Sequence, residues 1–325
     1  MARYLVTGAA GFIGSKVAEL LAAHGHDVIA VDNFNQAYDV RIKRWRAARL
    51  ESAVKLRVAE LDICDLTGTE SLLRAAGKVD AIINLAARAG VQPSVADPWT
   101  YLETNASGTI NLLELCRRLD IPKFILASTS SLYGTHNPMP FREDADTNQP
   151  LSPYAASKKA AETMAYTYHF LYGVDVTIFR YFTVYGPAGR PDMSLFRFCQ
   201  WIAEGRPLHL YGDGSYTRDF TFVDDIARGT ILGLKPVKYE IINLGNDQPH
   251  SMMEAINTLE IKIGKKAKIE FLPVKKADMP ATWADISKAQ EILGWKPEIA
   301  FDEGLGRMVG WYLTERDWAS QVLTE

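Results

Sequence analysis

Apolar residues in the first half of the chain form short β-branched runs that alternate with longer stretches of helical periodicity. The runs predict strands at residues 4–7, 28–32, 56–61, 81–85, 124–128 and 176–182. The stretches between them predict helices at 15–24, 105–119 and 153–172, each long enough to cross back over a sheet. Strands and helices in this order build βαβ units. The pattern therefore predicts an α/β fold with a doubly wound parallel sheet of the Rossmann type.

The alternation changes after residue 180. The glycines in YGDGSYTRDF, at 211–220, predict a hairpin, and a lysine-rich segment follows at 261–276. We therefore expect a first domain at 1–180 and a smaller C-terminal α/β domain at 181–325. A later apolar run at 240–244 predicts a strand that rejoins the first sheet, so residues 220–248 are expected to return to the first domain.

Composition narrows the class of protein. The 325 residues are 47% hydrophobic and 23% charged, as in a globular protein rather than a disordered one. The net charge of -3 gives no basic surface for nucleic acid. No apolar stretch reaches the roughly 20 residues that span a bilayer, and the N-terminus offers no signal cleavage site, so we expect a cytoplasmic protein. The widely spaced Cys64, Cys116 and Cys199 predict neither disulfides nor a metal site.

Three glycines, Gly8, Gly11 and Gly14, lie between the first predicted strand and the first predicted helix. In that setting a tight turn brings backbone N–H groups and a helix N-terminus against a pyrophosphate. Asp32 ends the second predicted strand, where its carboxylate can accept hydrogen bonds from a ribose diol and repel a 2′-phosphate. The pattern favours NAD as the cofactor, although two basic residues nearby leave NADP open.

A second candidate site begins at the helix predicted for 153–172. Ser152 and Pro153 form a typical helix start. Tyr154 and Lys158 are four residues apart and so share one helical face. We expect the ammonium of Lys158 to lower the pKa of the Tyr154 phenol from about 10 toward neutrality.

The hydroxyls of residues 128–131, Ser-Thr-Ser-Ser, follow the preceding predicted strand. They are expected at the carboxyl edge of the sheet, where ligands of such folds bind. Together with the Tyr-Lys pair they predict hydride transfer at a carbinol carbon. Tyr154 would act as the general base, Thr129 would hydrogen-bond the same oxygen, and Lys158 would hold the phenolate and the nicotinamide ribose.

Seven ordered motifs resemble the extended short-chain dehydrogenase/reductase family that acts on nucleotide sugars, and they run along nearly the whole chain. They are TGAAGFIG, the LAA of 85–87, STSSLYG, YAASK, RYFTVYGP, YGDGSYTRDFTFVDD and TWADISKA. The resemblance implies a UDP-sugar substrate, NAD and a homodimer built on a four-helix bundle. It also implies that the first domain binds NAD and that the second binds the UDP-sugar.

The resemblance extends the set of candidate site residues. The cofactor-binding residues are expected to be Gly8, Gly11, Phe12, Ile13, Gly14, Asp32, Asn33, Asn35, Asp62, Ile63, Leu85, Ala86, Ala87, Asn105, Tyr154 and Lys158. The substrate-binding residues are expected to be Ser128, Thr129, Ser130, Ser131, Tyr154, Thr183, Arg190, Arg218 and Asp278. Among these, Arg218 resembles the family's diphosphate contact and Asp278 its uridine-ribose contact. Lys275 stands where many members have Arg, which leaves a second diphosphate contact open.

The Ser/Thr segment separates the reactions of this family. Nucleotide-sugar 4,6-dehydratases carry Asp-Glu where Ser130 and Ser131 stand here, and UDP-glucuronate decarboxylases typically carry Glu at position 131. The stretches at 31–40 and 183–193 are most similar to UDP-glucuronate 4-epimerases. This resemblance implies an isomerase that interconverts UDP-glucuronate and UDP-galacturonate through a 4-keto intermediate. A UDP-glucose/UDP-galactose 4-epimerase, a UDP-glucuronate decarboxylase and a binding protein without turnover stay open as alternatives.

The acid sugar also has a physical argument of its own. Oxidation at C4 of a glucuronate gives a β-keto acid, which loses CO₂ when its carboxylate bond aligns with the carbonyl π system. Hydroxyl donors from Thr129, Ser130, Ser131 and Thr183, with Arg190 balancing the charge, could hold the carboxylate near the carbonyl plane. Such a site would preserve the keto acid until the hydride returns.

Overall fold

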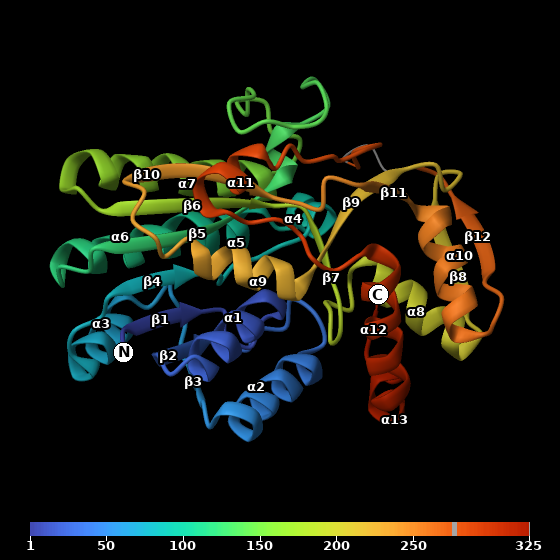
Figure 1. Ribbon diagram of the computed structural model, residues 1–325, viewed down its shortest axis with the longest axis horizontal. Coiled ribbons are helices and arrows are strands. Elements are labelled where there is room, and N and C mark those ends of the chain that lie inside the picture. Colours follow the sequence, from blue (N-terminus) through green and yellow to red (C-terminus); the bar gives the residue numbers. More distant parts are fainter. Residues whose placement is uncertain (275–277, 325) are drawn as a thin grey trace.

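The main sheet of the computed structural model, which describes residues 1–274 and 278–324, has seven parallel strands in the order β10-β6-β5-β4-β1-β2-β3 (Figure 1). Its strands are β1 (Arg3–Thr7), β2 (Asp27–Asp32), β3 (Val58–Glu60), β4 (Ala81–Asn84), β5 (Lys123–Thr129), β6 (Asp175–Tyr181) and β10 (Tyr239–Leu244). β4 and β5 are buried along their whole length, which explains why their sequences read as continuous apolar runs. The predicted doubly wound parallel sheet is confirmed.

Helices cover both faces of this sheet (Figure 1). One face packs against α1 (Phe12–Ala23), α2 (Val40–Val54), α9 (Val223–Leu232) and α11 (Ser287–Leu293). The other packs against α3 (Leu66–Ala76), α6 (Gly108–Arg118) and α7 (Pro153–Tyr172). The short helices α4 (Val91–Ala96) and α5 (Pro98–Leu102) and a π-helical turn, η1 (Glu103–Ser107), precede α6. The strand order reverses between β1 and β4, which opens a crevice at the carboxyl edge of the sheet.

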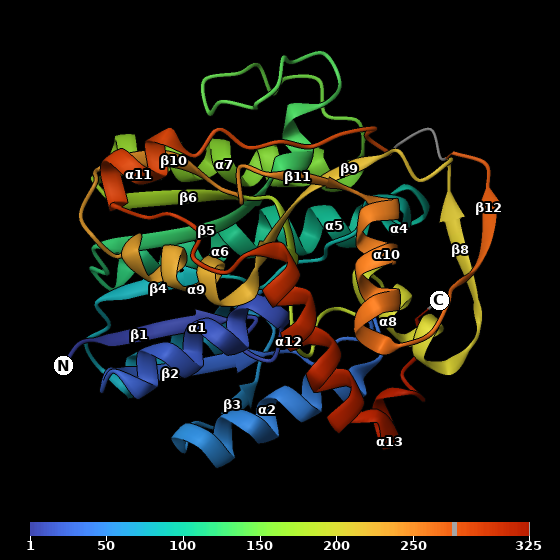
Figure 2. The same cartoon turned by 45° about the vertical axis from the view of Figure 1, so that its right-hand side comes forward.

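The remaining elements form a second region at the carboxyl side of the sheet (Figure 2). β11 (Pro249–Ser251), β9 (Thr217–Phe222) and β7 (Thr183–Tyr185) form a three-stranded sheet, and β12 (Lys268–Leu272) pairs in parallel with β8 (Pro207–Tyr211). The helices are α8 (Ser194–Glu204), α10 (Met252–Ile263), α12 (Phe301–Thr314) and α13 (Arg316–Ala319). A separate cluster of buried side chains, including Trp201, Ile256 and Leu305, fills this region.

β10 shows that the chain returns to the main sheet after entering the second region. It pairs in parallel with β6, with Ile242 opposite Phe179, at the position where the sequence predicted a rejoining strand. α9, which precedes β10, packs against α1 on the same sheet. Residues 223–244 are therefore part of the main α/β layer.

The hairpin predicted at 211–220 is wrong. Gly212 and Gly214 do turn the chain with φ of 77° and 86°, but β8 and β9 separate after the turn. β8 hydrogen-bonds to β12, whereas β9 lies between β11 and β7. The two strands separate because each pairs with a strand from elsewhere in the chain.

Among the described residues, no helix combines the length and the apolar character needed to cross a membrane.

Trp295 offers a test of the packing between α9 and the segment after α11. Its ring is fully buried, and its Nε1 donates to the carbonyl of Asp225 at 2.9 Å. Because truncation would leave a large cavity, we expect Trp295→Ala to lower the free energy of unfolding by about 3–5 kcal/mol in urea denaturation. Ile261→Ala, at an 81% exposed position, is the control and should change it by less than about 0.5 kcal/mol. Equal effects of the two variants would contradict this account of the core.

Candidate active site

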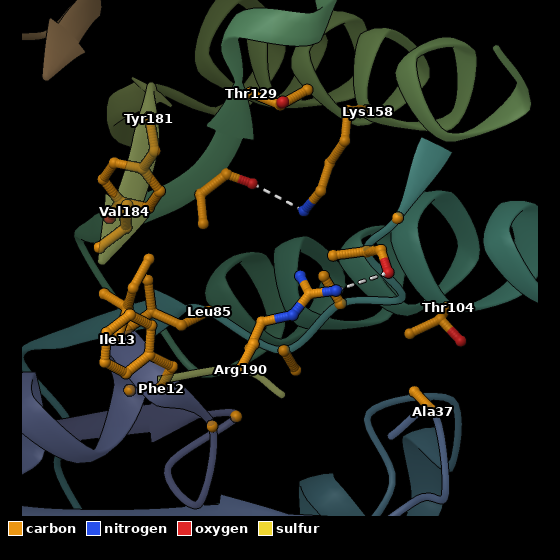
Figure 3. Close-up of a pocket in the computed structure, with 18 of the residues that line it drawn as sticks. Phe12, Ile13, Ala37, Leu85, Thr104, Thr129, Lys158, Tyr181, Val184 and Arg190 are labelled. Carbon is orange, nitrogen blue, oxygen red and sulfur yellow. Dashed lines mark hydrogen bonds between the residues drawn. The ribbon is translucent and has the colours of Figure 1, made fainter. Parts of the chain in front are cut away.

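A cleft with a volume of about 320 Å³ opens at the carboxyl edge of the main sheet (Figure 3). The predicted site residues that line it are Gly8, Gly11, Phe12, Ile13, Gly14, Asp32, Asn33, Asn35, Asp62, Ile63, Leu85, Ala86, Ala87, Ser128, Thr129, Ser130, Ser131, Tyr154, Lys158, Thr183 and Arg190. They come from the glycine loop, the ends of several strands, the start of α7 and the segment after β6. The fold thus brings residues that are far apart in the sequence to one crevice.

Three predicted site residues do not line this cleft. Asn105 is buried in η1, where its amide donates to the carbonyl of Arg88 and to Ser157 Oγ, both at 2.9 Å. Arg218 and Asp278 form an ion pair with each other at 2.8 Å. Their contacts with a cofactor or substrate stay predictions. Lys275 lies outside the described residues.

The glycine loop approaches neighbouring backbone too closely for side chains. Gly8 has φ of 66°, and a Cβ there would lie 2.8 Å from the backbone of Leu85 and Ala86. A Cβ on Gly14 would overlap the carbonyl oxygen of Gly8. The backbone alone therefore shapes this wall of the cleft, at the N-terminus of α1, as an anionic pyrophosphate requires.

Asp32 lies at the end of β2, beside the glycine loop, and is buried. Its carboxylate accepts hydrogen bonds from the backbone N–H groups of Phe34 at 2.8 Å and Ala10 at 3.2 Å. The ammonium of Lys43 lies 3.4 Å from Asp32 Oδ1 and 3.2 Å from Asn35 Oδ1. Lys43 is therefore already paired with an anion, which weakens it as a partner for a 2′-phosphate.

Asp62 and Asn33 form the next part of the wall. Asn33 Nδ2 donates to Asp62 Oδ2 at 2.8 Å, and the backbone N–H of Cys64 donates to Asp62 Oδ1 at 2.9 Å. Burial alone would raise the pKa of Asp62, but these hydrogen bonds lower it. Asp62 therefore stays ionised beside the cleft.

Lys158 is held by the strand that it faces. Its buried ammonium donates to the carbonyl of Ala127, the third residue from the end of β5, at 2.7 Å. Burial lowers the pKa of Lys158 to about 8, and the negative charge of Glu162 opposes that shift. Below about pH 8 the side chain therefore carries its positive charge into the site.

The pKa of Tyr154 differs from the one expected from the sequence. Burial raises the pKa of its phenol, while a hydrogen bond with Thr129 and the positive charge of Arg190 lower it. The expected net decrease caused by Lys158 is wrong for this structure, because desolvation is the largest effect and the ammonium is directed to the Ala127 carbonyl. Any loss of the phenol proton needs further positive charge in the cleft.

The hydroxyl side chains at the end of β5 are of two kinds. Thr129 Oγ1 donates to Ser131 Oγ at 3.1 Å and accepts from the backbone N–H of Ser131 at the same distance, at the cleft wall. Ser128 instead donates its hydroxyl to Glu162 Oε1 at 2.6 Å, in the protein interior. The predicted role of Ser128 in substrate binding stays a prediction, and its hydroxyl already has a buried partner.

Arg190 adds a further positive charge to the wall of the cleft, where it is ion-paired with Asp192. Figure 3 shows its guanidinium projecting into the space below Lys158. Its Nη2 donates to the carbonyl of Ala89 at 3.1 Å and its Nε donates to Asp192 at 3.1 Å, which orient the group. Only 20% of the side chain is exposed. A cation held in this way can bind an anionic group next to the Tyr154 phenol.

Arg46 is a structural residue of the site that sequence reasoning missed. Its buried guanidinium donates to the carbonyls of Ala10, Ala188 and Gly189 at 3.2, 3.0 and 3.0 Å, respectively. It thereby joins the glycine loop to the segment that carries Arg190. All three acceptors are backbone groups distant in sequence, so no local motif distinguishes Arg46 from a surface arginine of α2.

Comparisons with known proteins agree along almost the whole chain. A family model described as GDP-mannose 4,6 dehydratase matches residues 5–308. A UDP-glucuronate 4-epimerase from Thermodesulfobacterium geofontis is 53% identical over 312 residues, which cover 96% of each chain.

Solved structures agree as well. The UDP-glucuronic acid 4-epimerase from Bacillus cereus, in complex with UDP-glucuronic acid and NAD, superposes with a TM-score of 0.89 at 36% identity and covers 96% of this chain and 99% of that one. The UDP-glucose 4-epimerase from Thermotoga maritima, with UDP-glucose, superposes with a TM-score of 0.89 at 30% identity and covers 97% and 99%. The chain therefore belongs to the GDP-mannose 4,6 dehydratase family, within the extended short-chain dehydrogenases/reductases.

Proposed function

We propose that the chain is an NAD-dependent UDP-glucuronate 4-epimerase, an isomerase that interconverts UDP-glucuronate and UDP-galacturonate through a 4-keto intermediate. The observation that carries the proposal is the position of Arg190, whose positive charge lies in the cleft of Tyr154 and acts on its phenol. A sugar carboxylate can bind this guanidinium alongside Asp192, which already pairs with it, whereas a neutral sugar has no anionic group to do so. The relative that is 53% identical has the same activity in its name.

The residues of the cleft fit NAD. The glycine loop leaves room only for backbone against a pyrophosphate, and Asp32 stands where a ribose diol would be recognised. Lys43 is paired with Asp32, which favours NAD over NADP. Bound NAD supplies the acceptor and donor of hydride.

Proton transfer belongs to Tyr154. Its phenolate oxygen takes the proton of the sugar C4 hydroxyl and later returns it to the keto oxygen, while Thr129 hydrogen-bonds the same oxygen. Arg190 opposes the rise in the Tyr154 pKa that burial causes, and Lys158 carries a second positive charge on α7. The further positive charge that ionisation of the phenol requires would come from the oxidised nicotinamide of bound NAD.

The hydroxyl side chains and Arg190 determine whether the keto acid intermediate keeps its carboxylate. Thr129, Ser130, Ser131 and Thr183 line the same cleft as Arg190, so they can hold the sugar carboxylate near the carbonyl plane. Serines at 130 and 131 offer no carboxyl group to eliminate water or to assist decarboxylation. The similarity of fold does not separate acid from neutral sugars, because both epimerase structures superpose with a TM-score of 0.89.

The nucleotide part of the substrate is expected to bind at two further residues. Arg218 binds the diphosphate and Asp278 the uridine ribose, outside the cleft lining.

The protein is a cytoplasmic homodimer, in which α5 and α7 of two copies pack together. Large apolar side chains on these helices support such an interface, because Trp99 on α5 is 77% exposed and Phe170 on α7 is 74% exposed.

Product analysis tests the reaction itself. Purified protein incubated with UDP-glucuronate is expected to form UDP-galacturonate without loss of CO₂, resolved by chromatography and NMR. UDP-xylose or a 4-keto pentose would indicate a decarboxylase instead. Conversion of UDP-glucose with no change of UDP-glucuronate would overturn the acid-sugar proposal.

Tyr154→Phe tests the base. Without the phenol oxygen no group takes the C4 proton, so we expect turnover to fall by at least about 100-fold. Binding of UDP-glucuronate, measured by calorimetry, should change little because the ring is kept. Near-normal turnover would contradict the assigned role.

Arg190→Ala tests carboxylate recognition. Loss of a charge-assisted hydrogen bond, about 1.5–3 kcal/mol, should weaken binding of UDP-glucuronate by about 10-fold or more. Binding of UDP-glucose should weaken much less, and calorimetry with both nucleotide sugars measures the difference. Arg206→Ala is the control, since this arginine contacts the Ser320 carbonyl at the surface. Equal losses for the two sugars would exclude a carboxylate role for Arg190.

A further inference from the structure

Three successive residues at the end of β5 lie beside α7. The carbonyl of Ala127 accepts from Lys158 and the hydroxyl of Ser128 donates to Glu162, while Thr129 lines the same cleft as Tyr154 and acts to lower the pKa of its phenol. On α7 the partners Tyr154, Lys158 and Glu162 are each four residues apart and so form one stripe. Two of these side chains belong to the proposed chemistry, whereas Glu162 has no part in it.

Glu162 is almost fully buried, and so is its ion-pair partner. Only 2% of Glu162 and 2% of Arg180 are exposed. Arg180 donates from Nε to Glu162 Oε1 at 3.0 Å and from Nη2 to Glu162 Oε2 at 2.8 Å. Arg180 lies on β6 directly opposite Ser128 in the strand register. The carboxylate therefore joins two adjacent strands to α7.

Two further hydrogen bonds hold the guanidinium of Arg180 within this network. Its Nη1 donates to Tyr133 OH at 3.2 Å and to the carbonyl of Glu143 at 3.1 Å. The charged and titratable groups around the stripe include Tyr154, Lys158 and Glu162 on α7, Arg180 on β6, Tyr133 and Glu143 after β5, Tyr239 on β10 and, across the cleft, Arg190. Among them Glu162 is the anion that acts on Lys158, and it raises the pKa that burial lowers.

We propose that Glu162 is a positioning residue of the reaction, which ties the hydroxyl-bearing end of β5 and Arg180 of β6 to α7 and so holds Lys158 against the Ala127 carbonyl. The role rests on the proposed function of Lys158. Glu162 lies one helical turn from Lys158 on the same stripe, so the strand end that Glu162 holds is the one whose carbonyl receives the ammonium. A carboxylate placed only for stability would need no such position relative to the Tyr-Lys pair.

Glu162→Gln tests this proposal in two ways. The titration of Lys158, followed by the ¹³C NMR signal of its Cε carbon and assigned by its loss in Lys158→Met, is expected to move to lower pH by about 1. In turnover of UDP-glucuronate, the alkaline limb of the kcat/KM profile should move the same way. We expect kcat at pH 8 to fall by about 5-fold or more and KM to change by less than about 3-fold.

Three further variants separate positioning from folding. Glu162→Gln/Arg180→Gln removes the cation left unpaired in the single variant, and should show the same direction of shift. Glu162→Asp keeps the charge and should restore the Lys158 titration at least in part. Glu143→Gln removes another carboxylate of this region, which accepts from the backbone N–H of Asn243 at 2.8 Å, and should leave the titration in place.

The two measurements distinguish failure of this proposal from failure of the proposed function. An unchanged Lys158 titration in both Glu162→Gln variants, or an equal shift in Glu143→Gln, would overturn the role of Glu162. Absence of wild-type turnover with UDP-glucuronate would overturn the proposed function, while the NMR titration would still decide whether Glu162 controls the charge of Lys158.

Discussion

The hydrogen bond from Lys158 to the Ala127 carbonyl is the contact on which the geometry of the cleft depends. A buried ammonium is strongly unfavourable without a partner, so this bond fixes the rotation of α7 against the end of β5. Rotation in turn brings Tyr154 to Thr129, and the parallel sheet places both at the crevice where the strand order reverses. Tyr154, Thr129 and the glycine loop line one cleft because the sheet and α7 bring their ends to the same edge.

Local signals in the sequence were sufficient for the main sheet. Strands buried on both faces read as continuous apolar runs, and α7 begins and ends as predicted because Ser152 caps its start and Gly173 ends it with φ of 72°. The glycine loop was also readable, since backbone crowding at Gly8 and Gly14 excludes every other residue. For the strands, α7 and Gly14 the determining interaction lies within a few residues of the signal or repeats along the element, whereas Gly8 is crowded by the distant backbone of Leu85 and Ala86.

Features set by distant partners could not be read in this way. The predicted hairpin failed because β8 and β9 pair with strands from other parts of the chain. The direction of the Tyr154 pKa shift depends on burial, which spacing along a helix does not express. The same holds for Asn105, whose place beneath the cleft follows from the π-helical turn that carries it. Many residues predicted for the site line one cleft, but the orientation of each side chain was visible only in three dimensions.

Arg46 has a consequence for movement within the cleft. Because one guanidinium holds backbone carbonyls from the glycine loop and from the segment before Arg190, the two walls form a single stiff frame. Opening one wall would break several buried hydrogen bonds at once. In the proposed epimerase reaction the sugar ring presents its opposite face to the same hydride donor, so it would turn between two walls that Arg46 holds together.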